Sequence, residues 1–574
     1  MTSRASNILK YSLLAVVLMI AGAAVFSQTQ MFRNTLRSTL YTFLEKEINA
    51  DIYIGEITGN LVNGFSVDTV MMYIDGAPFV ESGRLSVRYK LFDLLNNRIT
   101  VDSLTLMNPS IHLIRRKDGE WNVSRLSKST SPKDSSESPL VVTAGRIQIV
   151  NGKFHLTDST GDVNGLSLPD TGLRSINYAN MDFSSLDVDL KGMYSQQSML
   201  VELDQLSCVS AGERFILNRL SGVFRHTKDQ SSLTDLNIYT PATRLTASVT
   251  VERMDAFTIG SLSDLRRAQV TISVKPSELQ MSDLQYFLPS LTFLKGNVRF
   301  NGEIEGNTEN LTVRRLNASF GTSTVALNGS ITKIHEPDEM RLNIVSTQSV
   351  VNPSDLPVLM PYYGIPDYAS LGPVTIDFQF VGKPLDFLAI SKIKSAAGTV
   401  TVDGEMVFTE ENVHYKGLLA GSDVNLEKIF ATNELRSRLN ARIFIEGDGF
   451  SLDDMKAEAT IQIDSSSIRN IPLNTASIAV KAGERTINGD VVVQSPDGKI
   501  SARTMLDFND RTATAYEVTA NVRDLDLGSV FQDEYYSSDL SFNIERTGKG
   551  LTLFDNESET DRSEEHTSEL QSRI

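Results

Sequence analysis

Histidine and cysteine are the side chains that most readily transfer protons or bind a metal near neutral pH. The chain has six histidines and a single cysteine, Cys208. No histidine lies within four residues of another and no H-E-x-x-H pattern occurs, which excludes a metal-binding pair on one helix. One cysteine excludes a disulfide within the chain and a zinc site built from cysteines. Structural roles are therefore expected for His112, His155, His226, His335 and His414.

Motifs for nucleophilic or acid–base catalysis are weak. No G-x-S-x-G, Walker A or G-x-G-x-x-G motif occurs. Ser391 and Lys394 have the S-x-x-K spacing of some serine–lysine enzymes, but the companion motifs are absent and the spacing is common by chance. Asp453 and Asp454 would point to opposite faces of a strand, so we expect them in a solvated turn. The sequence predicts no enzyme, no catalytic residue, no metal site and no cofactor.

Length and charge restrict the class of protein. At 574 residues the chain is too long for one compact core, so several domains or one elongated repeat array are expected. Its 71 acidic and 54 basic residues give a formal charge of −17, which would repel a polyanion, so nucleic acid is not an expected partner. With 41% hydrophobic residues, the chain fits neither a disordered protein nor a multi-span membrane protein.

An apolar segment near the N-terminus directs the rest of the chain to or across a membrane. Residues 11–26 are apolar except for Ser12, and counted from Ile8 the segment reaches roughly the 20 residues that span a bilayer as a helix. Flanking positive residues give a slight bias toward a cytoplasmic N-terminus. We predict an uncleaved transmembrane signal-anchor; a signal peptide cleaved near residues 21–23 is the alternative.

Two features on the C-terminal side of the apolar segment could contact lipid. Apolar residues at helical spacing from Phe32 to Ile48 predict an amphipathic helix, which either caps the first sheet or rests on an anionic lipid surface. A basic cluster before Asp118-Gly119 is interpreted either as a hairpin tip in water or as a contact for lipid headgroups. The residues of this cluster are Arg115, Arg116, Lys117 and Trp121.

From about Asp51 onward the dominant hydrophobic period is two. Residues 297–305 and 399–408, for example, alternate apolar and polar residues, which is typical of sheets with one apolar and one polar face. Long helical patterns are absent after the first fifty residues. The predicted fold is all-β: an N-terminal transmembrane helix followed by an elongated, repetitive, curled and mostly antiparallel β-sheet array with short helical turns.

The pattern apolar-x-apolar-x-Gly-x-apolar recurs along this array and places glycine on the apolar face. Glycine there removes bulk and permits a bend, so the repeated pattern predicts a sheet curled around its apolar face. At Asp403-Gly404 and Asn488-Gly489 the alternative is a hairpin turn. The main glycines are Gly302, Gly329, Gly404 and Gly447. The apolar residues expected to line the curled face are Val298, Phe300, Ile304, Val325, Leu327, Ile331, Val400 and Val402.

Short helical pieces follow strands near residues 282–287, 354–359, 425–430 and 527–531, at intervals of about 70 to 100 residues, as in a stacked array. The expected parts are a cytoplasmic tip and signal-anchor (1–29), a module of one amphipathic helix and strands (30–126), a low-complexity linker (127–139), the repetitive array (140–561) and a tail (562–574). The tail reads RSEEHTSELQS and resembles the in-frame translation of a common sequencing adapter. We therefore expect an N-terminal fragment whose natural sequence departs near Asp561.

Residues 51–123 resemble the start of the AsmA-like family, in its TamB branch. The resemblance is strong near the N-terminus and rests only on the alternating texture beyond about residue 160. It is carried by the apolar anchor, by Ile54-Gly55-Glu56-Ile57-x-Gly59-Asn60-Leu61, by Leu85-x-Val87-x-Tyr89, by Leu94-Leu95, by Ile99–Pro109 and by Asp118-Gly119-Glu120-Trp121. The C-terminal domain through which this family meets the outer-membrane TamA/BamA-like partner has no counterpart in this sequence.

The resemblance implies a single-pass protein of the bacterial inner membrane, with its body in the periplasm and a β-groove that links inner and outer membranes. Its implied partners are the inner membrane, phospholipids and the TamA/BamA-like protein. Family members are associated with phospholipid transport in outer-membrane biogenesis, and the TamB branch with translocation and assembly of outer-membrane proteins. The apolar face with its glycines favours a lipid groove, because lipid tails need continuous apolar surface. A scaffold with a sealed core is a third possibility, and whether the apolar face is open distinguishes it.

We expect the body of the protein to be exported. A reporter enzyme that is active only outside the cytoplasm, fused after Ser127, should be active in cells, because the apolar segment sends the rest of the chain across the membrane. A reporter that works only in the cytoplasm, fused at the same position, is the control and should be inactive. Activity of the cytoplasmic reporter would contradict a location in the envelope.

Overall fold

The structure is a computed structural model of the chain. It describes residues 26–60, 64–90, 93, 98–126, 141–160, 175–195, 197–255, 262–409, 412–430, 432, 435–469, 471–510, 513–550 and 557–566. The apolar segment predicted as an anchor lies outside these ranges except for its last residue, as does the predicted linker 127–139. No helix in the described ranges is long and apolar enough to span a bilayer. Strands account for 64% of the structure, which confirms the all-β prediction.

The chain divides into two compact units, Met1–Asn307 (unit 1) and Thr308–Ile574 (unit 2). The described strands of unit 1 are β1 (Asp51–Ile54), β2 (Ile57–Asn60), β3 (Gly64–Val67), β4 (Val70–Ile74), β5 (Ala77–Ser82), β6 (Arg84–Tyr89), β7 (Arg98–Met107), β8 (Ser110–Arg115), β9 (Val141–Asp158), β10 (Asn180–Tyr194), β11 (Ser198–Ser210), β12 (Ile216–Thr227), β13 (Gln230–Tyr239), β14 (Arg244–Glu252), β15 (Gln269–Gln280) and β16 (Asn297–Gly306). Its described helices are α2 (Gln30–Glu47), α3 (Met281–Phe287) and the 3-10 turns η2 (Asn122–Arg125), η3 (Ala211–Glu213), η5 (Leu262–Arg266) and η6 (Pro289–Leu291).

Helix α2 covers the first strands of unit 1. It begins after Thr29, whose hydroxyl accepts a hydrogen bond from the Phe32 N–H at 3.2 Å. Leu36, Leu44 and Ile48 pack against a cluster of buried residues from the strands. That cluster consists of Ile52, Ile54, Ile57 and Val67. The predicted amphipathic helix therefore exists and seals this end of the apolar core.

Strand β9 joins the segments on either side of residues 127–140 into one sheet. Its first half pairs in parallel with β7 and its second half in parallel with β8. From β9 to β16 each strand then pairs antiparallel with the next. The strands before and after the predicted linker therefore share one hydrogen-bond ladder.

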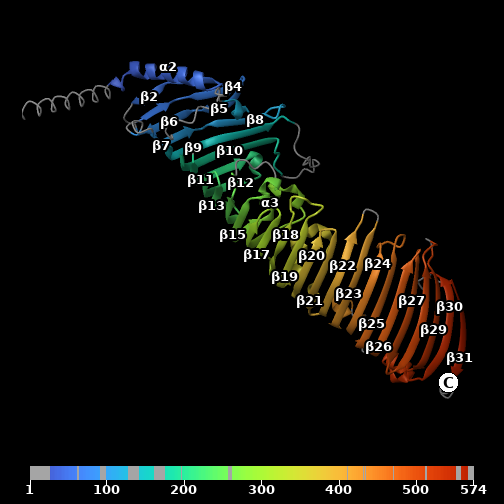
Figure 1. The fold of residues 1–574 in the computed structure, drawn as a ribbon. Helices are drawn as coiled ribbons and strands as arrows, with labels where there is room; N and C mark the ends of the chain where they lie inside the picture. The colour runs from blue at the N-terminus through green and yellow to red at the C-terminus, as the bar shows by residue number, and fades with distance from the viewer. Residues whose placement is uncertain are drawn as a thin grey trace, which may run out of the picture. The chain divides into compact units, whose positions relative to one another are not determined.

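The strands of unit 2 succeed one another in a regular ladder. They are β17 (Asn310–Phe320), β18 (Ser323–Thr332), β19 (Arg341–Val351), β20 (Val374–Lys383), β21 (Asp386–Ser395), β22 (Gly398–Phe408), β23 (Val413–Val424), β24 (Ser437–Asp448), β25 (Lys456–Ile468), β26 (Ile471–Gly483), β27 (Thr486–Ser495), β28 (Gly498–Asp507), β29 (Ala515–Leu525), β30 (Leu540–Lys549) and β31 (Glu557–His566). Each pairs antiparallel with the next, and Figure 1 shows β20 to β30 side by side in chain order, from yellow to red.

Antiparallel order places the connections of unit 2 on two opposite edges of its sheet. All connections after odd-numbered strands lie on one edge, here called the odd rim, and those after even-numbered strands lie on the even rim. The odd rim carries the short helical segments η7 (Pro353–Asp355), α4 (Leu356–Leu359), η8 (Pro361–Tyr363), η9 (Ala369–Leu371), α5 (Leu426–Phe430), α6 (Leu527–Phe531) and η11 (Glu534–Tyr536). Together with α3 these segments confirm the predicted short helices.

Three strands of unit 2 bend at a bulge just before such a helix. In β19, β23 and β29 the bulge residue has a positive φ, which leaves its N–H outside the regular ladder. In each case a polar side chain on the next strand accepts a hydrogen bond from that N–H. The pairs are Gln348–Asp377 (2.6 Å), Asp423–Asn440 (3.0 Å) and Asp524–Ser541 (3.1 Å). Each of these bulges is therefore stabilised by residues from two neighbouring strands.

The hairpin-turn alternative for two Asx-Gly pairs is wrong. Gly404 lies in the middle of β22 and Gly489 in the middle of β27, each within a continuous ladder on both sides. Asp-Gly and Asn-Gly form tight turns when both residues take a positive φ, and none of these four residues does so. The alternation of apolar and polar residues on both sides of each pair therefore predicts the structure better than the Asx-Gly dipeptide does.

The adapter-like tail is described only in part. Its first residues belong to β31, which pairs with β30, and residues 567–574 lie outside the described ranges. The β31 positions that pair with Phe542, Ile544, Arg546 and Gly548 are Glu564, Arg562, Thr560 and Ser558. The apolar pattern of the preceding strands stops at this strand.

On the odd rim, Asp355 links the connection after β19 to the turn between β17 and β18. Its Oδ2 accepts hydrogen bonds from the Thr322 N–H (2.9 Å), the Thr322 hydroxyl (3.0 Å) and the Ser323 hydroxyl (2.8 Å). Burial by itself would raise the pKa of this carboxyl, but the hydrogen bonds from Ser323 and Thr322 outweigh it and the pKa is lowered. A Cβ at Gly321 would meet the Asp355 carboxylate at 2.3 Å, so glycine is required beside it.

We expect Asp355→Ala to loosen this turn. Hydrogen bonds to a charged group contribute about 1.5–3 kcal/mol, so hydrogen exchange at the Thr322 amide should accelerate roughly 10- to 100-fold. Because the pKa of Asp355 is lowered in the folded chain, the protection is complete above the ordinary aspartate range and is lost as pH falls through the folded pKa. Asp338→Ala, at an exposed carboxylate, is the control. Equal exchange in both variants would contradict the assigned role.

Candidate functional site

The register of unit 2 sorts its side chains onto two faces. In β21, for example, Phe387, Ala389, Ser391 and Ile393 lie on one face, whereas Asp386, Leu388, Ile390 and Lys392 lie on the other. Directly paired residues of neighbouring strands share a face, so the register extends this division from strand to strand. We call the side with Phe387 the apolar face and the other side the polar face.

A continuous row of residues crosses the apolar face from β17 to β30. Each member pairs directly with the next one on the neighbouring strand. The row is Leu316, Leu327, Ser346, Phe378, Ser391, Val402, Leu419, Ile443, Ile461, Ile478, Val491, Ala502, Ala520 and Ile544. The thirteen steps at about 4.8 Å each give a length on the order of 60 Å. Two of the predicted lining residues, Leu327 and Val402, are thereby placed in one row.

The other predicted lining residues fall into two groups. Val325 and Ile331 lie on the apolar face in β18, and Val400 lies on it in β22, next to Val402. Val298, Phe300 and Ile304 share a face of β16 in unit 1. Their partners on β15 are Leu279, Ser277 and Ile272. Five of the eight residues therefore share the apolar face of unit 2, and three belong to unit 1.

Large side chains on the apolar face are only half buried. Leu327, Phe378, Leu419, Ile443 and Ile461 all keep part of their surface in solvent. Within the described part of unit 2, the buried hydrophobic residues are Val374, Ala397, Tyr415, Ala476 and Val522. A second protein layer would bury the large aliphatic side chains of a sheet almost completely. The described residues therefore leave this face uncovered.

The size of the uncovered face distinguishes it from ordinary surface. Strands of about ten residues at roughly 3.3 Å per residue make the face on the order of 30 Å wide, and so on the order of 2,000 Å² in area. The largest apolar patch of a typical soluble monomer measures about 300–600 Å². A face several times larger, which none of the described residues covers, is the strongest candidate for a binding surface in the part of the chain that the structure describes.

The predicted glycines occupy two neighbouring rows of the apolar face. Gly404 pairs with Gly417, so two adjacent strands lack a side chain at one point, and Gly329 belongs to the same row. Gly447 lies in the next row, opposite Tyr415. The pairs Gly382–Phe387 and Gly548–Tyr516 repeat this aromatic–glycine arrangement in that row. Rings therefore stand beside these glycines, whereas Gly404 and Gly417 leave a gap.

Gly302 pairs with Val274 in unit 1 and is buried. Gly417 was not among the predicted glycines, although Val413, Tyr415, Gly417 and Leu419 follow the same pattern. The sequence pattern that predicts the other glycines therefore also identifies Gly417.

The polar face carries ion pairs between directly opposed residues. Lys416 and Glu446 are 2.9 Å apart, Lys481 and Glu458 are 2.8 Å apart, and Arg503 and Asp490 are 3.0 Å apart. These side chains are exposed, so the pairs add little to stability, but they keep this face in water. The same face also carries exposed large apolar side chains, among them Leu388, Ile390, Leu418 and Phe444, so it is mixed in character.

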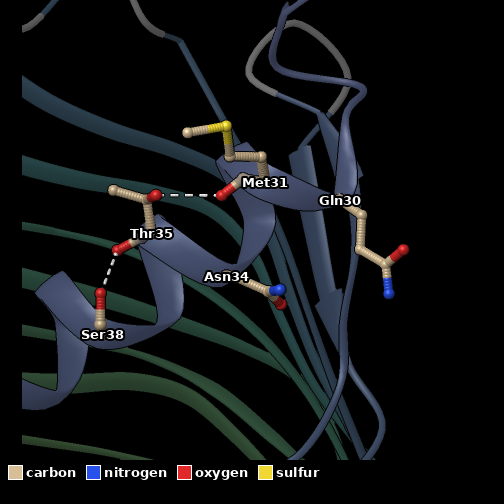
Figure 2. Close-up of a pocket in the computed structure, with 5 residues that line it drawn as sticks. All are labelled: Gln30, Met31, Asn34, Thr35 and Ser38. Carbon is tan, nitrogen blue, oxygen red and sulfur yellow. Dashed lines mark hydrogen bonds between the residues drawn. The ribbon is translucent and has the colours of Figure 1, made fainter.

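A depression beside α2 is a weaker candidate for a binding site than the apolar face. Figure 2 shows its lining residues Gln30, Met31, Asn34, Thr35 and Ser38, which all belong to one helix. The Thr35 hydroxyl donates to the Met31 carbonyl at 2.9 Å and the Ser38 hydroxyl to the Thr35 carbonyl at 2.8 Å (Figure 2). These hydroxyls donate to carbonyls of the helix itself, and the lining contains no charged side chain to anchor a ligand.

The basic cluster at the end of β8 is paired with carboxylates. Arg115 lies 3.3 Å from Asp158, and its guanidinium stands over the ring of Trp121 at 5.8 Å. Arg116 forms an ion pair with Asp75, whereas Lys117 is exposed. Neighbouring Arg125 pairs with Asp118 at 2.7 Å and with Glu120 at 2.8 Å. This neutralised network favours the solvated-turn interpretation over a contact with lipid headgroups.

The residues considered for catalysis are dispersed or point apart. Ser391 and Lys394 lie on opposite faces of β21 and cannot act together. Asp454 accepts a hydrogen bond from the Ser451 N–H at 2.9 Å in a turn. Burial raises the pKa of the Cys208 thiol to about 11, which makes it a poor nucleophile.

The five histidines considered above are held in side-chain contacts. The rings of His112 and His155 stack at 4.6 Å, and His414 lies 3.0 Å from Asp448. His226 contacts Ser231 at 2.7 Å, and His335 lies 3.2 Å from Glu336. No cluster of metal-ligating side chains occurs in the part of the chain that the structure describes.

The two kinds of glycine should respond differently to a methyl group. A Cβ at Gly447 would meet the Lys456 carbonyl and the Ala457 Cβ at 2.7 Å, so we expect Gly447→Ala to destabilise the fold by about 1–3 kcal/mol. At Gly404 the nearest atom is the Lys416 carbonyl at 3.2 Å, and the β-propensity gained by alanine offsets the contact. The midpoint of urea unfolding should fall for the first variant only. A larger loss for Gly404→Ala would contradict the gap described above.

No family model, no curated protein and no solved structure matches this chain. The features that bear on its function are therefore the geometry of the apolar face and the resemblance noted in the sequence.

Proposed function

We propose that this chain is an inner-membrane-anchored envelope protein whose apolar face forms a curled β-groove that carries phospholipids between the inner and outer membranes, in support of outer-membrane biogenesis. The observation that carries the proposal is the uncovered apolar face of unit 2, with half-buried aliphatic residues in continuous rows. The resemblance to the TamB branch of the AsmA-like family supports the same function.

Acyl chains are the occupant that best matches this face. Covering apolar surface gains about 25 cal/mol per Å², and each buried methylene group about 0.8 kcal/mol, so tails bind the face without any directional contact. In a bilayer the tails are already out of water, so their transfer to the groove is nearly balanced. A balanced exchange is what a carrier needs, because tight binding would trap the lipid.

An open apolar face also allows the charged lipid headgroup to remain in water while the tails are bound. A phosphate cannot enter an apolar interior without a large desolvation cost. If tails lie on the apolar face and the open side meets water, the headgroup stays hydrated during movement. The bulges of β19, β23 and β29 and the glycine rows support the curvature that such a groove requires.

The alternatives receive less support. A scaffold with a sealed core would bury its large aliphatic side chains, whereas Leu419 and Ile443 are only half buried. An assembly factor for outer-membrane proteins that works with a TamA/BamA-like partner does not by itself require a continuous uncovered apolar face of this length. The apolar face favours the lipid function over both.

A photo-crosslinking amino acid at Leu327 or at Phe300 should capture phospholipid in cells, because both side chains lie on apolar faces. The adjacent residues Asn328 and Arg299 point to the other side, are exposed, and are the matched controls, which should capture none. Mass spectrometry of the adducts identifies the lipid. Capture of protein alone at Leu327 and Phe300 would sink the proposal.

A charge in the row should interrupt lipid passage. Leu327→Arg should reduce lipid capture at Val402, which lies in the same row, roughly tenfold or more, because an unpaired charge is costly among acyl chains. The fold should survive, since water reaches an uncovered face. Asn328→Arg, on the polar face, should leave capture unchanged. If Leu327→Arg unfolds the chain while Asn328→Arg does not, the face is a sealed core.

A further inference from the structure

The even rim of unit 2 carries large apolar side chains over a limited stretch. Leu385, in the turn between β20 and β21, is 61% exposed, and Phe450, after β24, is 63% exposed. Phe408 at the end of β22 and Leu452 beside Phe450 are each 37% exposed. The Phe408 N–H donates to the Leu385 carbonyl at 2.8 Å, which links two of these turns. Turn tips are normally polar, so four large apolar residues at successive turns require a reason.

Stacked rings connect this part of the rim with the apolar face. Phe380 lies in the row that contains Gly404, and its ring stacks on Phe387 at 4.7 Å. Phe387 in turn stacks on Phe408 at 6.5 Å. A second connection runs from Tyr415 to Phe450, whose rings are 5.0 Å apart and nearly parallel. The apolar surface therefore continues from the middle of the sheet to its edge.

The described turns on either side of this stretch are charged. The connection after β18 contains Lys333, Glu336 and Glu339, and Glu339 pairs with Lys383 at 3.3 Å. In the turn after β26, Arg485 pairs with Asp453 and donates to the Phe508 carbonyl. Among the described even-rim turns, exposed large apolar residues therefore occur after β20, β22 and β24, where Lys383 and Asp453 add charges beside them.

The odd rim also exposes large apolar side chains, among them Val358, Phe430 and Phe531, but these lie on longer connections that contain short helices. Its long connections fold back over neighbouring turns and are held by hydrogen bonds. Besides Asp355 on the β17–β18 turn, the Ser370 hydroxyl donates to the Lys428 carbonyl at 2.6 Å, and the Lys428 ammonium donates to the Ala396 carbonyl at 2.9 Å. At the apolar stretch of the even rim, the connections are shorter than those after β19 and β23 on the odd rim. Less of the chain therefore stands between the solvent and the apolar face at this edge.

We propose that Leu385, Phe408, Phe450 and Leu452 form a lateral portal through which a phospholipid acyl chain passes between the apolar face and a neighbouring lipid surface. The inference rests on the proposed lipid function and adds the place where tails leave or join the groove. The occupant is an acyl chain because the same apolar surface continues without a break into the rows described above. A tail that slides over Phe408 and Phe387 remains in apolar contact along the whole path.

Photo-crosslinking in cells tests the portal with the full chain. The crosslinker at Leu385 or Phe450 should capture phospholipid. The matched controls are Val358 and Tyr363 on the odd rim, which are 69% and 63% exposed and should capture none. Leu419, on the apolar face, reports whether the groove itself holds lipid.

Substitutions then test whether the portal is used. Leu385→Ser combined with Phe450→Ser should lower lipid capture at Leu419 about tenfold, because two large apolar contacts are removed from the path. Val358→Ser combined with Tyr363→Ser should leave it unchanged. All four residues are exposed, but Phe450 stacks on the buried Tyr415, so Leu385→Ser alone, which should also lower capture at Leu419, separates loss of the portal from loss of stability.

The outcomes separate the portal from the proposed function. Lipid at Leu419 without lipid at Leu385 and Phe450 would overturn the portal and leave the lipid function standing. Equal capture on both rims, or capture of protein alone at Phe450, would also overturn the portal. Absence of lipid at Leu419 and Leu327 in the unsubstituted chain would overturn the lipid function itself.

Discussion

One feature governs the structure of unit 2: within its described residues, no second protein layer covers the apolar face of the sheet. Most sheets cover such a face by packing against a helix or another sheet. Among the described residues, a helix covers a sheet in this way in unit 1, where α2 packs on Ile52, Ile54 and Ile57. In unit 2 the large aliphatic side chains remain half buried, so part of the apolar free energy that usually stabilises a fold is left for another molecule.

With few buried residues, unit 2 depends on contacts between neighbouring strands. The ladder from β17 to β31 satisfies the backbone, and cross-strand pairs such as Lys416–Glu446 keep the polar face in water. Bulges are stabilised by side chains from the next strand, as at Gln348 and Asp377, so each bend requires residues from two strands. Stability of this kind is local and resembles that of repeat proteins. The net charge of −17 opposes association of chains through their apolar faces.

Much of this arrangement could be predicted from the sequence, because side-chain alternation has a period of two in any strand. The apolar face, the glycines on it and the short helices after β19, β23 and β29 are all encoded in local patterns. The hairpin alternative at Asp403-Gly404 was wrong because a turn dipeptide and a mid-strand glycine look alike until the flanking ladder is known. The parallel pairing of β9 with β7 and β8 joins segments across residues 127–140, and no local pattern specifies such a pairing.

The rows of directly paired residues could not be predicted from the sequence either. They depend on the register of every strand pair and on the register shifts at the bulges. Their alignment is nevertheless the property that bears most on function. From β18 to β29, the row positions on the apolar face carry no charged side chain within the described register, and Ser346 and Ser391 are the polar interruptions of the row through Leu327. The first charge in these rows is Arg546 in β30, whose guanidinium lies over Tyr516 at 5.9 Å. Under the proposed function, such a surface recognises tails and not headgroups, because it offers a phosphate no ion pair along its length. It also gives a tail nearly the same surroundings at each step, so movement along the rows meets no deep energy minimum.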